Sequence, residues 1–539
     1  MPSASVSNTH NMSESNVQTV SAGSLIHYLL LHPVQGSVAC CFLLFTYYVL
    51  HSIVKGFSPG LSSIPGPTFA RFSSLYRPWK LAGGDAPNIY RVLHERYGRI
   101  VRTGPNTVDI SDPAAVSLVY GINSKFLKSA FYDTFSPFHE ETVMASMFSV
   151  RDPSQHQALR RPVAQKFSMS SIRAMEPFAD ECTDIFLHAM RSLEGQSVDL
   201  GSWLQWYAFD VIGAITFQRR FGFMEKREDV LGMIRSIDSA LRYAALAGQV
   251  PAVHGWLMGN RWVSRFLAAQ PFVDIPDPLR TIVKYTQECI DEYDRQPVAE
   301  HGDRPDFLSW LRGEAAKGKP MSHRNLINHL SNNLLAGSDT TAISLRAIVY
   351  FLVKNPSVYQ KLQSEIDAAD QAGKLSYYVT YAECLELPYL QAVMKEAMRC
   401  HPGVSYPLER VVPASGVELC GVHLKAGTIV SVNPAVMHLD QSVFGDDAAK
   451  FRPERWTDSD LERVKIMDRH LMTFGYGSRT CIGKNISIME MGKLIPQLVR
   501  HFDIEWASDC PEWRVETFWF AKQYGLICRL TSRTNGKKM

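Results

Sequence analysis

Cys481 and the residues around it carry the strongest chemical signal in this chain of 539 residues. The run from Phe474 to Gly483 reads FGYGSRTCIG, and an apolar helical pattern follows at about 486–499. A thiolate placed just before a helix is stabilised by free backbone N–H groups and by the positive end of the helix dipole. Such a thiolate is a suitable axial ligand for haem iron. A lone cysteine is more often a small buried apolar residue, but the glycines and Arg479 beside Cys481 favour the ligand.

A second polar group interrupts the helical pattern predicted at 322–353. Gly337, Asp339, Thr340 and Thr341 are poor choices for a helix interior. The glycine removes bulk, and the Thr340 hydroxyl can bond to a carbonyl one turn earlier, which opens a helix locally. The opening would leave room for dioxygen and water. A crossing of two helices at small residues explains the same pattern and stays open as an alternative.

Two further pairs have helical spacing. Glu396 and Arg399 lie three residues apart on one helix face, where an exposed pair contributes only about 0.2–0.5 kcal/mol. His156 and Arg160 lie four residues apart and point the same way. A bound anionic group would find donors on that face.

These segments, in this order, resemble the cytochromes P450. The cysteine loop matches the family's haem-binding pattern at Phe474, Gly477, Arg479, Cys481 and Gly483. The helical run from Ala336 to Thr341 matches the family's oxygen-activation motif at every position, and Glu396 with Arg399 matches its Glu-x-x-Arg pair. His156 stands where the family often has tryptophan, which departs from the pattern but keeps a hydrogen-bond donor.

The resemblance implies a role for each matched residue. Cys481 would be the axial ligand of haem b, and Asp339 with Thr340 would deliver protons during oxygen activation. Glu396 and Arg399 would form structural support with Arg455, or with Arg452, in the later Phe451–Trp456 segment. The haem propionates need cationic or donor partners, for which the candidates are His156, Arg160, Arg410 and Arg479.

The hydrophobic pattern, read with the resemblance, predicts a mainly α protein with small β-sheets and the cytochrome P450 fold. Long helices are expected at 155–168, 172–193, 201–216, 277–294, 322–353, 356–369 and 387–400. A hairpin is expected at 100–103 and 107–110, with further strands at 417–424, 428–432 and 524–530.

The N-terminal region has the composition of a membrane anchor. No Asp, Glu, Lys or Arg occurs between Glu14 and Lys55, and the 21 residues 34–54 would rise about 30 Å as a helix, enough to cross a bilayer. We therefore predict a lumenal segment at 1–33, a transmembrane anchor at 34–54, a proline-rich hinge at 55–67 and a catalytic domain at 68–539. A cleaved signal peptide is the alternative, but the segment lacks a basic start and lies far from Met1.

The charged residues beside the predicted anchor set its expected orientation in the membrane. Positive residues follow the anchor, which places the catalytic domain in the cytosol, and the resemblance places the anchor in the endoplasmic reticulum membrane. Asn11 begins an Asn-x-Ser sequon and would be a lumenal glycosylation acceptor on that topology.

The composition of the chain excludes some classes of partner and cofactor. A net charge of +3 argues against a dedicated nucleic-acid binder, and ten scattered cysteines without a Cys-x-x-Cys pair argue against structural zinc. No flavin or nicotinamide motif is visible, so electrons are expected from NADPH through a cytochrome P450 reductase. An expected docking patch for its acidic surface comprises Lys484, Lys493, Arg160 and Arg161.

The resemblance implies a haem-thiolate monooxygenase that inserts one atom of O2 into an apolar small molecule. Gly248–Pro251 and the cysteine loop look like the fungal pisatin-demethylase-like branch, which suggests a terpenoid, polyketide or alkaloid intermediate of secondary metabolism. Two alternatives stay open: a haem-thiolate isomerase or dehydratase, against which Asp339 and Thr340 argue, and a non-catalytic haem-binding protein. Substrate contacts are expected from Ser129–Ser146, Asn332, Asn333, Ala336, Val404–Pro407 and Phe518–Lys522.

Overall fold

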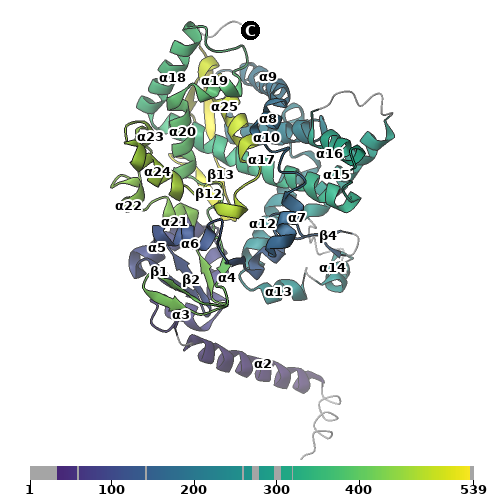
Figure 1. Cartoon of the computed structure of the whole chain (residues 1–539), viewed down its shortest axis with the longest axis vertical. Coiled ribbons are helices and arrows are strands. Elements are labelled where there is room, and N and C mark those ends of the chain that lie inside the picture. Colours follow the sequence, from purple (N-terminus) through teal and green to yellow (C-terminus); the bar gives the residue numbers. More distant parts are fainter. Residues whose placement is uncertain are drawn as a thin grey trace, which may run out of the picture. The chain divides into compact units, whose positions relative to one another are not determined.

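A computed structural model gives the structure of the chain (Figure 1). It describes residues 33–57, 60–139, 142–257, 260–269, 278–296, 305–318 and 320–533. The chain falls into two units, Met1–Phe57 and Ser58–Met539. The sequon at Asn11 and most of the predicted lumenal segment lie outside the described residues.

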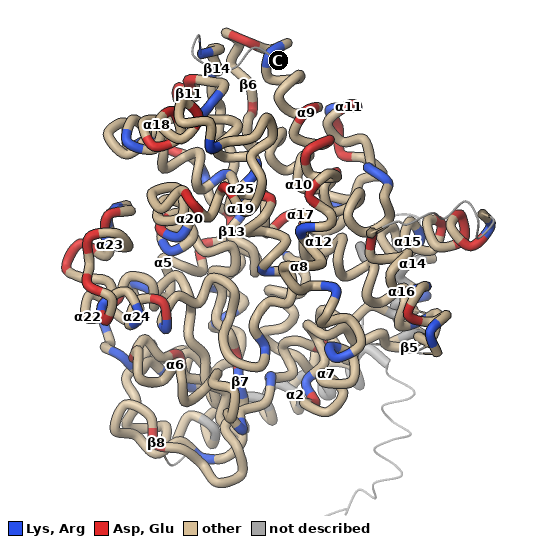
Figure 2. The backbone as a smooth tube through the Cα atoms, turned by 45° about the horizontal axis from the view of Figure 1, so that its top comes forward, with Lys and Arg blue, Asp and Glu red and all other residues tan. Residues whose placement is uncertain are grey.

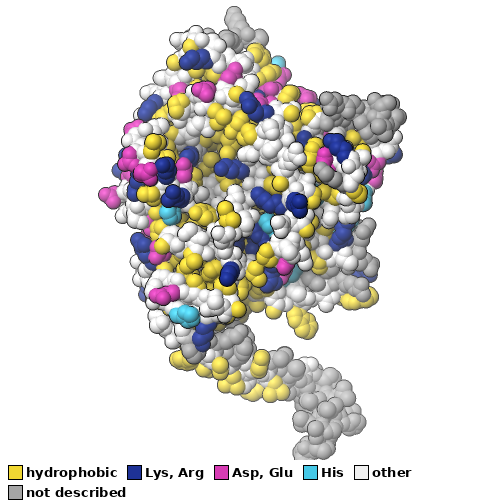
Figure 3. Space-filling view, in the orientation of Figure 1, with side chains coloured by type: hydrophobic (Ala, Val, Ile, Leu, Met, Phe, Trp, Pro, Cys, Tyr) yellow, Lys and Arg dark blue, Asp and Glu magenta, His cyan; other side chains and the backbone are white. Residues whose placement is uncertain are grey.

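The described part of the first unit is one helix, α2, which spans Pro33–Gly56 and covers the predicted anchor. Large apolar side chains are exposed along it, among them Val38, Phe42, Leu43 and Leu50 (Figure 3). Within the described residues, no helix meets the length and hydropathy required to span a membrane.

Long helices dominate the second unit, as the sequence predicts. They are α9 (Glu176–Ser192), α10 (Leu200–Phe217), α12 (Met233–Ala247), α15 (Pro278–Arg295), α17 (His323–Lys354), α18 (Pro356–Gln371), α20 (Pro388–Cys400) and α25 (Lys484–His501). The helix predicted at 155–168 is shorter, because α7 spans only Pro153–Arg160. Pro162 has no N–H to donate to the Ala158 carbonyl, so the α-helical hydrogen bonding ends there, although Arg161 itself keeps helical backbone angles. The sequence patterns did not predict α12.

Short helices connect the long ones. They are α3 (Thr68–Phe72), α4 (Tyr76–Leu81), α5 (Ala86–Tyr97), α6 (Pro113–Tyr120), α8 (Met169–Arg173), α11 (Phe223–Lys226), α13 (Pro251–Trp256), α14 (Arg261–Ala268), α16 (Phe307–Ala316), α19 (Tyr381–Leu385), α21 (Pro434–Met437), α22 (Gln441–Phe444), α23 (Glu454–Thr457) and α24 (Leu461–His470). Short 3-10 helices complete the helical part of the described residues: η1 (Ala130–Phe135), η2 (Val230–Gly232) and η4 (Gly477–Arg479).

The largest sheet has five strands in the order β1-β2-β10-β7-β3. The predicted hairpin is confirmed as β1 and β2, which pair antiparallel, and the predicted strand at 428–432 is β10. Helices α3 and α5 pack against β1 (Figure 1). The bounds are β1 (Ile100–Gly104), β2 (Thr107–Ile110), β3 (Leu127–Lys128), β7 (Arg410–Val411) and β10 (Ile429–Ser431).

The remaining strands form small separate sheets. The strand predicted at 417–424 is a hairpin of two strands, and the one predicted at 524–530 contains the end of β13 and most of β14, separated by a turn at Gly525. The bounds are β4 (Phe138–His139), β5 (Thr142–Val143), β6 (Ser197–Asp199), β8 (Val417–Leu419), β9 (Val422–Leu424), β11 (Phe502–Trp506), β12 (Arg514–Phe518), β13 (Phe520–Tyr524) and β14 (Ile527–Ser532).

The crossing of α10 and α17 forms the centre of the main apolar core. At Gly337 the two helices approach so closely that a Cβ atom would lie 2.8 Å from Cδ1 of Ile212. Real side chains do not tolerate that distance. The helix-crossing explanation therefore accounts for this glycine, and α17 continues through it as one helix.

Candidate active site

The cysteine loop is a tight turn held by backbone hydrogen bonds. The N–H of Cys481 donates to the carbonyl of Phe474 at 2.8 Å, and that of Thr480 donates to Gly477 at 3.1 Å. Gly477 has φ of +60°, and a Cβ atom there would lie 2.0 Å from the carbonyl oxygen of Tyr120. Only glycine fits this position. The predicted glycine turn is therefore required by the close approach of α6.

The Cys481 side chain is accessible and lies just before α25, with the backbone amides of Gly483 and Lys484 directed at it. Desolvation raises the pKa of the thiol, and the two amides and the charges of Arg160 and Lys484 oppose that rise. These groups stabilise a negative sulfur, and coordination to a metal cation removes the thiol proton outright. The loop therefore suits a thiolate ligand.

The four predicted propionate partners lie in one region of the structure. Arg479 donates to the carbonyls of Val150 and Arg151 at 2.9 and 3.1 Å, which ties the cysteine loop to the segment before α7. Arg160, at the end of α7, donates to the carbonyl of Thr480 at 3.0 Å.

The other two partners belong to the same group of basic residues. Arg410, on β7, donates to the Tyr132 hydroxyl at 3.2 Å. His156 is buried on α7, and its pKa falls to about 4 through burial first and then through the charges of Arg479 and Arg160.

Sequence reasoning missed a further basic residue of this cluster, Lys128. It is buried at the end of β3, with its ammonium 4.0 Å from the ring centre of Tyr132, and it donates to the carbonyl of Phe148. Burial, then Arg410 and Arg479, lower the pKa of Lys128 well below its usual value. No motif surrounds Lys128 in the sequence, so only the pairing of β3 with β7 reveals its place beside Arg410.

The cations repel one another. Burial and the charge of Arg410 lower the pKa of Arg479 to about 10. Buried charges of one sign are costly unless an anionic group compensates them. The two carboxylates of haem supply that charge, so this cluster, beside the cysteine loop, fits the haem propionates.

Asp339 and Thr340 face different surroundings on α17. The Thr340 hydroxyl donates to the Ala336 carbonyl at 2.6 Å, as the sequence predicts, and Ala336 is exposed. Asp339 is buried, and its Oδ1 accepts a hydrogen bond from Nε2 of Gln205 on α10. The neighbouring Thr341 hydroxyl lies 2.9 Å from that of Ser487, which joins α17 to α25 and thereby to the cysteine loop.

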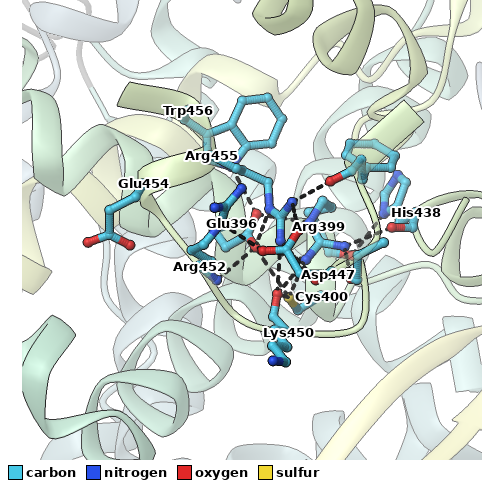
Figure 4. A network of polar contacts seen from close by, with 12 residues as sticks. Glu396, Arg399, Cys400, His438, Asp447, Lys450, Arg452, Glu454, Arg455 and Trp456 are labelled. Atoms are coloured by element: carbon cyan, nitrogen blue, oxygen red, sulfur yellow. Dashed lines mark hydrogen bonds and ion pairs between the residues drawn. The ribbon is translucent and has the colours of Figure 1, made fainter. Parts of the chain in front are cut away.

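Glu396 and Arg399 are buried at the centre of a polar network, as the resemblance implies (Figure 4). Oε1 of Glu396 accepts from Arg399 Nη2 and from Arg455 Nε, both at 2.8 Å. Its Oε2 accepts from Arg399 Nε and from Trp456 Nε1, both at 2.9 Å. Arg455 is thus the partner, while the guanidinium of Arg452 binds Asp447 instead.

One residue of the predicted docking patch was assigned wrongly. Lys493 is buried on α25, where its ammonium lies 3.1 Å from Glu176 and 2.8 Å from Asp180 of α9. Helix α25 is buried over this stretch, so a lysine there must pair internally. Lys484 and Arg161 are exposed and remain available on the surface.

Comparison with known proteins decides the family. The Cytochrome P450 family model matches residues 72–527. The chain belongs to the cytochrome P450 family. Cytochrome P450 monooxygenase cicH of Emericella nidulans is 36% identical over 89% of this chain and 95% of its own length. Cytochrome P450 monooxygenase gsfF of Penicillium aethiopicum is 35% identical over 88% and 94%, and pisatin demethylase of Fusarium vanettenii is 35% identical over 88% and 90%.

The family and these relatives make this protein a cytochrome P450 monooxygenase, with haem iron as the cofactor that the family implies. The site fits that cofactor. Cys481 would hold the iron, and Lys128, His156, Arg160, Arg410 and Arg479 would hold the propionates.

Proposed function

We propose that this cytochrome P450 inserts one atom of O2 into an apolar small molecule, an intermediate of fungal secondary metabolism. A terpenoid, a polyketide or an alkaloid is the proposed substrate class, and electrons come from NADPH through a separate reductase. The observation that carries the proposal is the Cys481 thiol, which lies just before α25 with two backbone amides directed at it. The fungal relatives, among them one named pisatin demethylase, support the substrate class.

The bound haem would supply the oxidising chemistry, and the chain's own residues would position the reactants and deliver protons. Cys481 would hold the haem iron and would supply electron density to it. Because the Thr340 proton is engaged with the Ala336 carbonyl, the lone pairs of its hydroxyl are free to hold a water on the exposed side. Asp339, the preceding residue, is the carboxyl group nearest in sequence that can renew that water's protons.

Reductase docking is proposed at α7 and the start of α25. Arg161 and Lys484 are exposed there, and Arg160 reaches the cysteine loop. Figure 2 shows basic residues, in blue, near α7. A basic surface around the cysteine loop suits an acidic partner. Lys493 has no part in this surface because it is paired internally.

We also propose that α2 attaches the protein to the endoplasmic reticulum membrane, with the catalytic unit in the cytosol and Asn11 in the lumen. The support is the interval without charge between Glu14 and Lys55 and the exposed apolar side chains of α2. Deleting residues 1–57 should release the protein from membranes and preserve haem binding. The deletion stops there because Leu61 and Ile64 are buried in the core. Full-length protein that does not sediment with membranes would contradict the attachment.

Labelled oxygen tests the reaction. The full-length protein, reductase and NADPH are incubated with panels of fungal polyketides, terpenoids and alkaloids under isotopically labelled O2. A product that gains one labelled oxygen atom while NADPH is consumed supports a monooxygenase. A product of unchanged mass formed without NADPH would favour the isomerase, and haem binding without any conversion would favour a non-catalytic carrier.

A further inference from the structure

A charged cavity of about 290 Å³ lies beside Asp339. Helices α12 and α17 and the β12–β13 hairpin contribute its walls, including Asp238, Ile343 and Phe518. Each water molecule occupies roughly 30 Å³ in the liquid, so several fit in this space. The other charged side chains on its wall are Asp229, Arg235, Arg242, Glu516 and Lys522.

An ion pair and a buried acid occupy different depths of this cavity. Lys522 Nζ binds both carboxylate oxygens of Asp238, at 2.8 and 2.7 Å. The Asp238 side chain is 37% exposed and that of Lys522 is 10% exposed, whereas Asp339 is 2% exposed. The cavity therefore leads from a partly solvated ion pair to a buried carboxyl group.

One carboxylate oxygen of Asp339 accepts a hydrogen bond from a protein side chain, and the other accepts none from the described residues. Arg346 Nη2 donates to Gln205 Oε1 at 2.8 Å, which directs the amide nitrogen of Gln205 at Oδ1 of Asp339. Arg346 is itself fixed by a bond of 2.8 Å from Nε to the carbonyl of Gly201. Oδ2 of Asp339 has no hydrogen-bond partner among the described residues although it is buried. A buried carboxylate oxygen without a protein partner is a site for water.

We propose that the Lys522–Asp238 pair is the solvent-side entrance of a water-filled proton route that ends at Asp339. The inference rests on the proposed function, for which it names the proton source. A proton from bulk water enters at Asp238 or at a water bound to Lys522, crosses the cavity through water, and reaches Asp339. Asp339 passes one proton on toward the Thr340 side of α17 for each proton that it receives, so the charge of the cavity does not change.

The surroundings of Asp238 suit this role. Burial raises the pKa of Asp238, Lys522 lowers it, and the nearby Asp339 raises it again, with a net rise. An acid that is easier to protonate than a free aspartate accepts protons more readily at neutral pH. Successive residues of a helix point about 100° apart, so Asp339 contacts the cavity while Thr340 lies on the adjoining face.

The test uses haem-loaded full-length protein without added substrate, so that the unknown substrate is not needed. Lys522→Met and Asp238→Asn should each lower NADPH oxidation with reductase about 10-fold and increase its solvent isotope effect in D2O. The matched control is Arg242→Gln, which lines the same cavity but packs on the Phe518 ring, 4.6 Å from its centre, and should behave as wild type. The reduced CO spectrum of each variant establishes that the haem site is intact.

A second measurement does not depend on turnover. A crystal structure of the haem-loaded protein should show ordered waters joining Asp339 Oδ2 to the Lys522–Asp238 pair. Wild-type NADPH oxidation in both variants with intact spectra, or a cavity without such waters, would overturn the route while leaving the monooxygenase proposal standing.

Discussion

Replacing Glu396 by Gln should destabilise the catalytic unit by about 3 kcal/mol, because it removes the carboxylate that two buried guanidinium groups share. The Glu396 carboxylate accepts four hydrogen bonds from side-chain N–H groups and another from the backbone N–H of Arg452 at 3.0 Å. Breaking a buried pair by removing one partner costs about 3–5 kcal/mol. Arg399 and Arg455 keep bonds to backbone carbonyls, such as that of Arg399 to His438 at 2.7 Å, which favours the lower end of that range.

The effect should also depend on pH. Burial alone would raise the pKa of Glu396, but the hydrogen bond and charge of Arg399, with the charge of Arg455, outweigh it and lower the pKa below 4.5. A lowered pKa in the folded state gives stability that is complete above the unfolded value and is lost as pH falls through the folded value. The difference between wild type and Glu396→Gln should therefore shrink in acid.

The assay follows the CO band of the reduced haem-loaded protein through urea unfolding at neutral pH. The control is Asp468→Asn, which breaks an exposed pair with Lys395 at 2.8 Å and should cost at most about 1 kcal/mol. If Glu396→Gln costs no more than Asp468→Asn, the network does not stabilise the domain as its geometry indicates.

Three further predictions concern the rest of the described chain. His94 binds Asp109 at 2.7 Å, and although burial lowers the pKa of His94, the hydrogen bond and charge of Asp109 outweigh burial and raise it. The stability that this pair contributes is therefore complete below pH 6.5 and is lost as pH rises through the folded pKa. His94→Gln should lose this pH dependence. Gly477→Ala should abolish haem incorporation, read as loss of the Soret band, because its Cβ atom would clash with Tyr120. Lys128→Met should speed haem transfer to apomyoglobin about 10-fold or more, since hydrogen bonds to charged groups contribute roughly 1.5–3 kcal/mol.

Two of these predictions have a control variant. Gly525→Ala tests strain alone, because Gly525 has φ of +82° in open space, and it should retain haem. Lys125→Met removes an exposed lysine near Lys128 and should leave haem transfer unchanged. Equal effects of either control and its partner would refute the corresponding argument, as would an identical pH dependence of unfolding in wild type and His94→Gln.

Local chemistry made much of the fold and site predictable. Cys481, Gly477 and Arg479 lie within one short motif, and most of the long helices have strong apolar periodicity, so both appear directly in the sequence. The partner of Glu396 was correctly narrowed to two arginines. Only the structure separates them, since Arg455 points into the core while the Arg452 side chain is half exposed beside Asp447.

Features that depend on contacts between distant segments were not predictable. Lys128 joins the cation cluster through the pairing of β3 with β7, which no local pattern encodes. Gln205 meets Asp339 only because α10 crosses α17. Lys493 was placed on the surface because its sequence neighbourhood does not reveal that α9 covers that face of α25 with two acids.

The reduced CO difference spectrum of Cys481→Ala tests the central claim most directly. Wild type should show the band diagnostic of a thiolate ligand, and the variant should lose that band or lose haem altogether. Cys510→Ala is the control, because Cys510 is exposed, unpaired and outside the cysteine loop, and its spectrum should match wild type. A thiolate band that persists in Cys481→Ala would assign the iron ligand to another residue and contradict this account of the site.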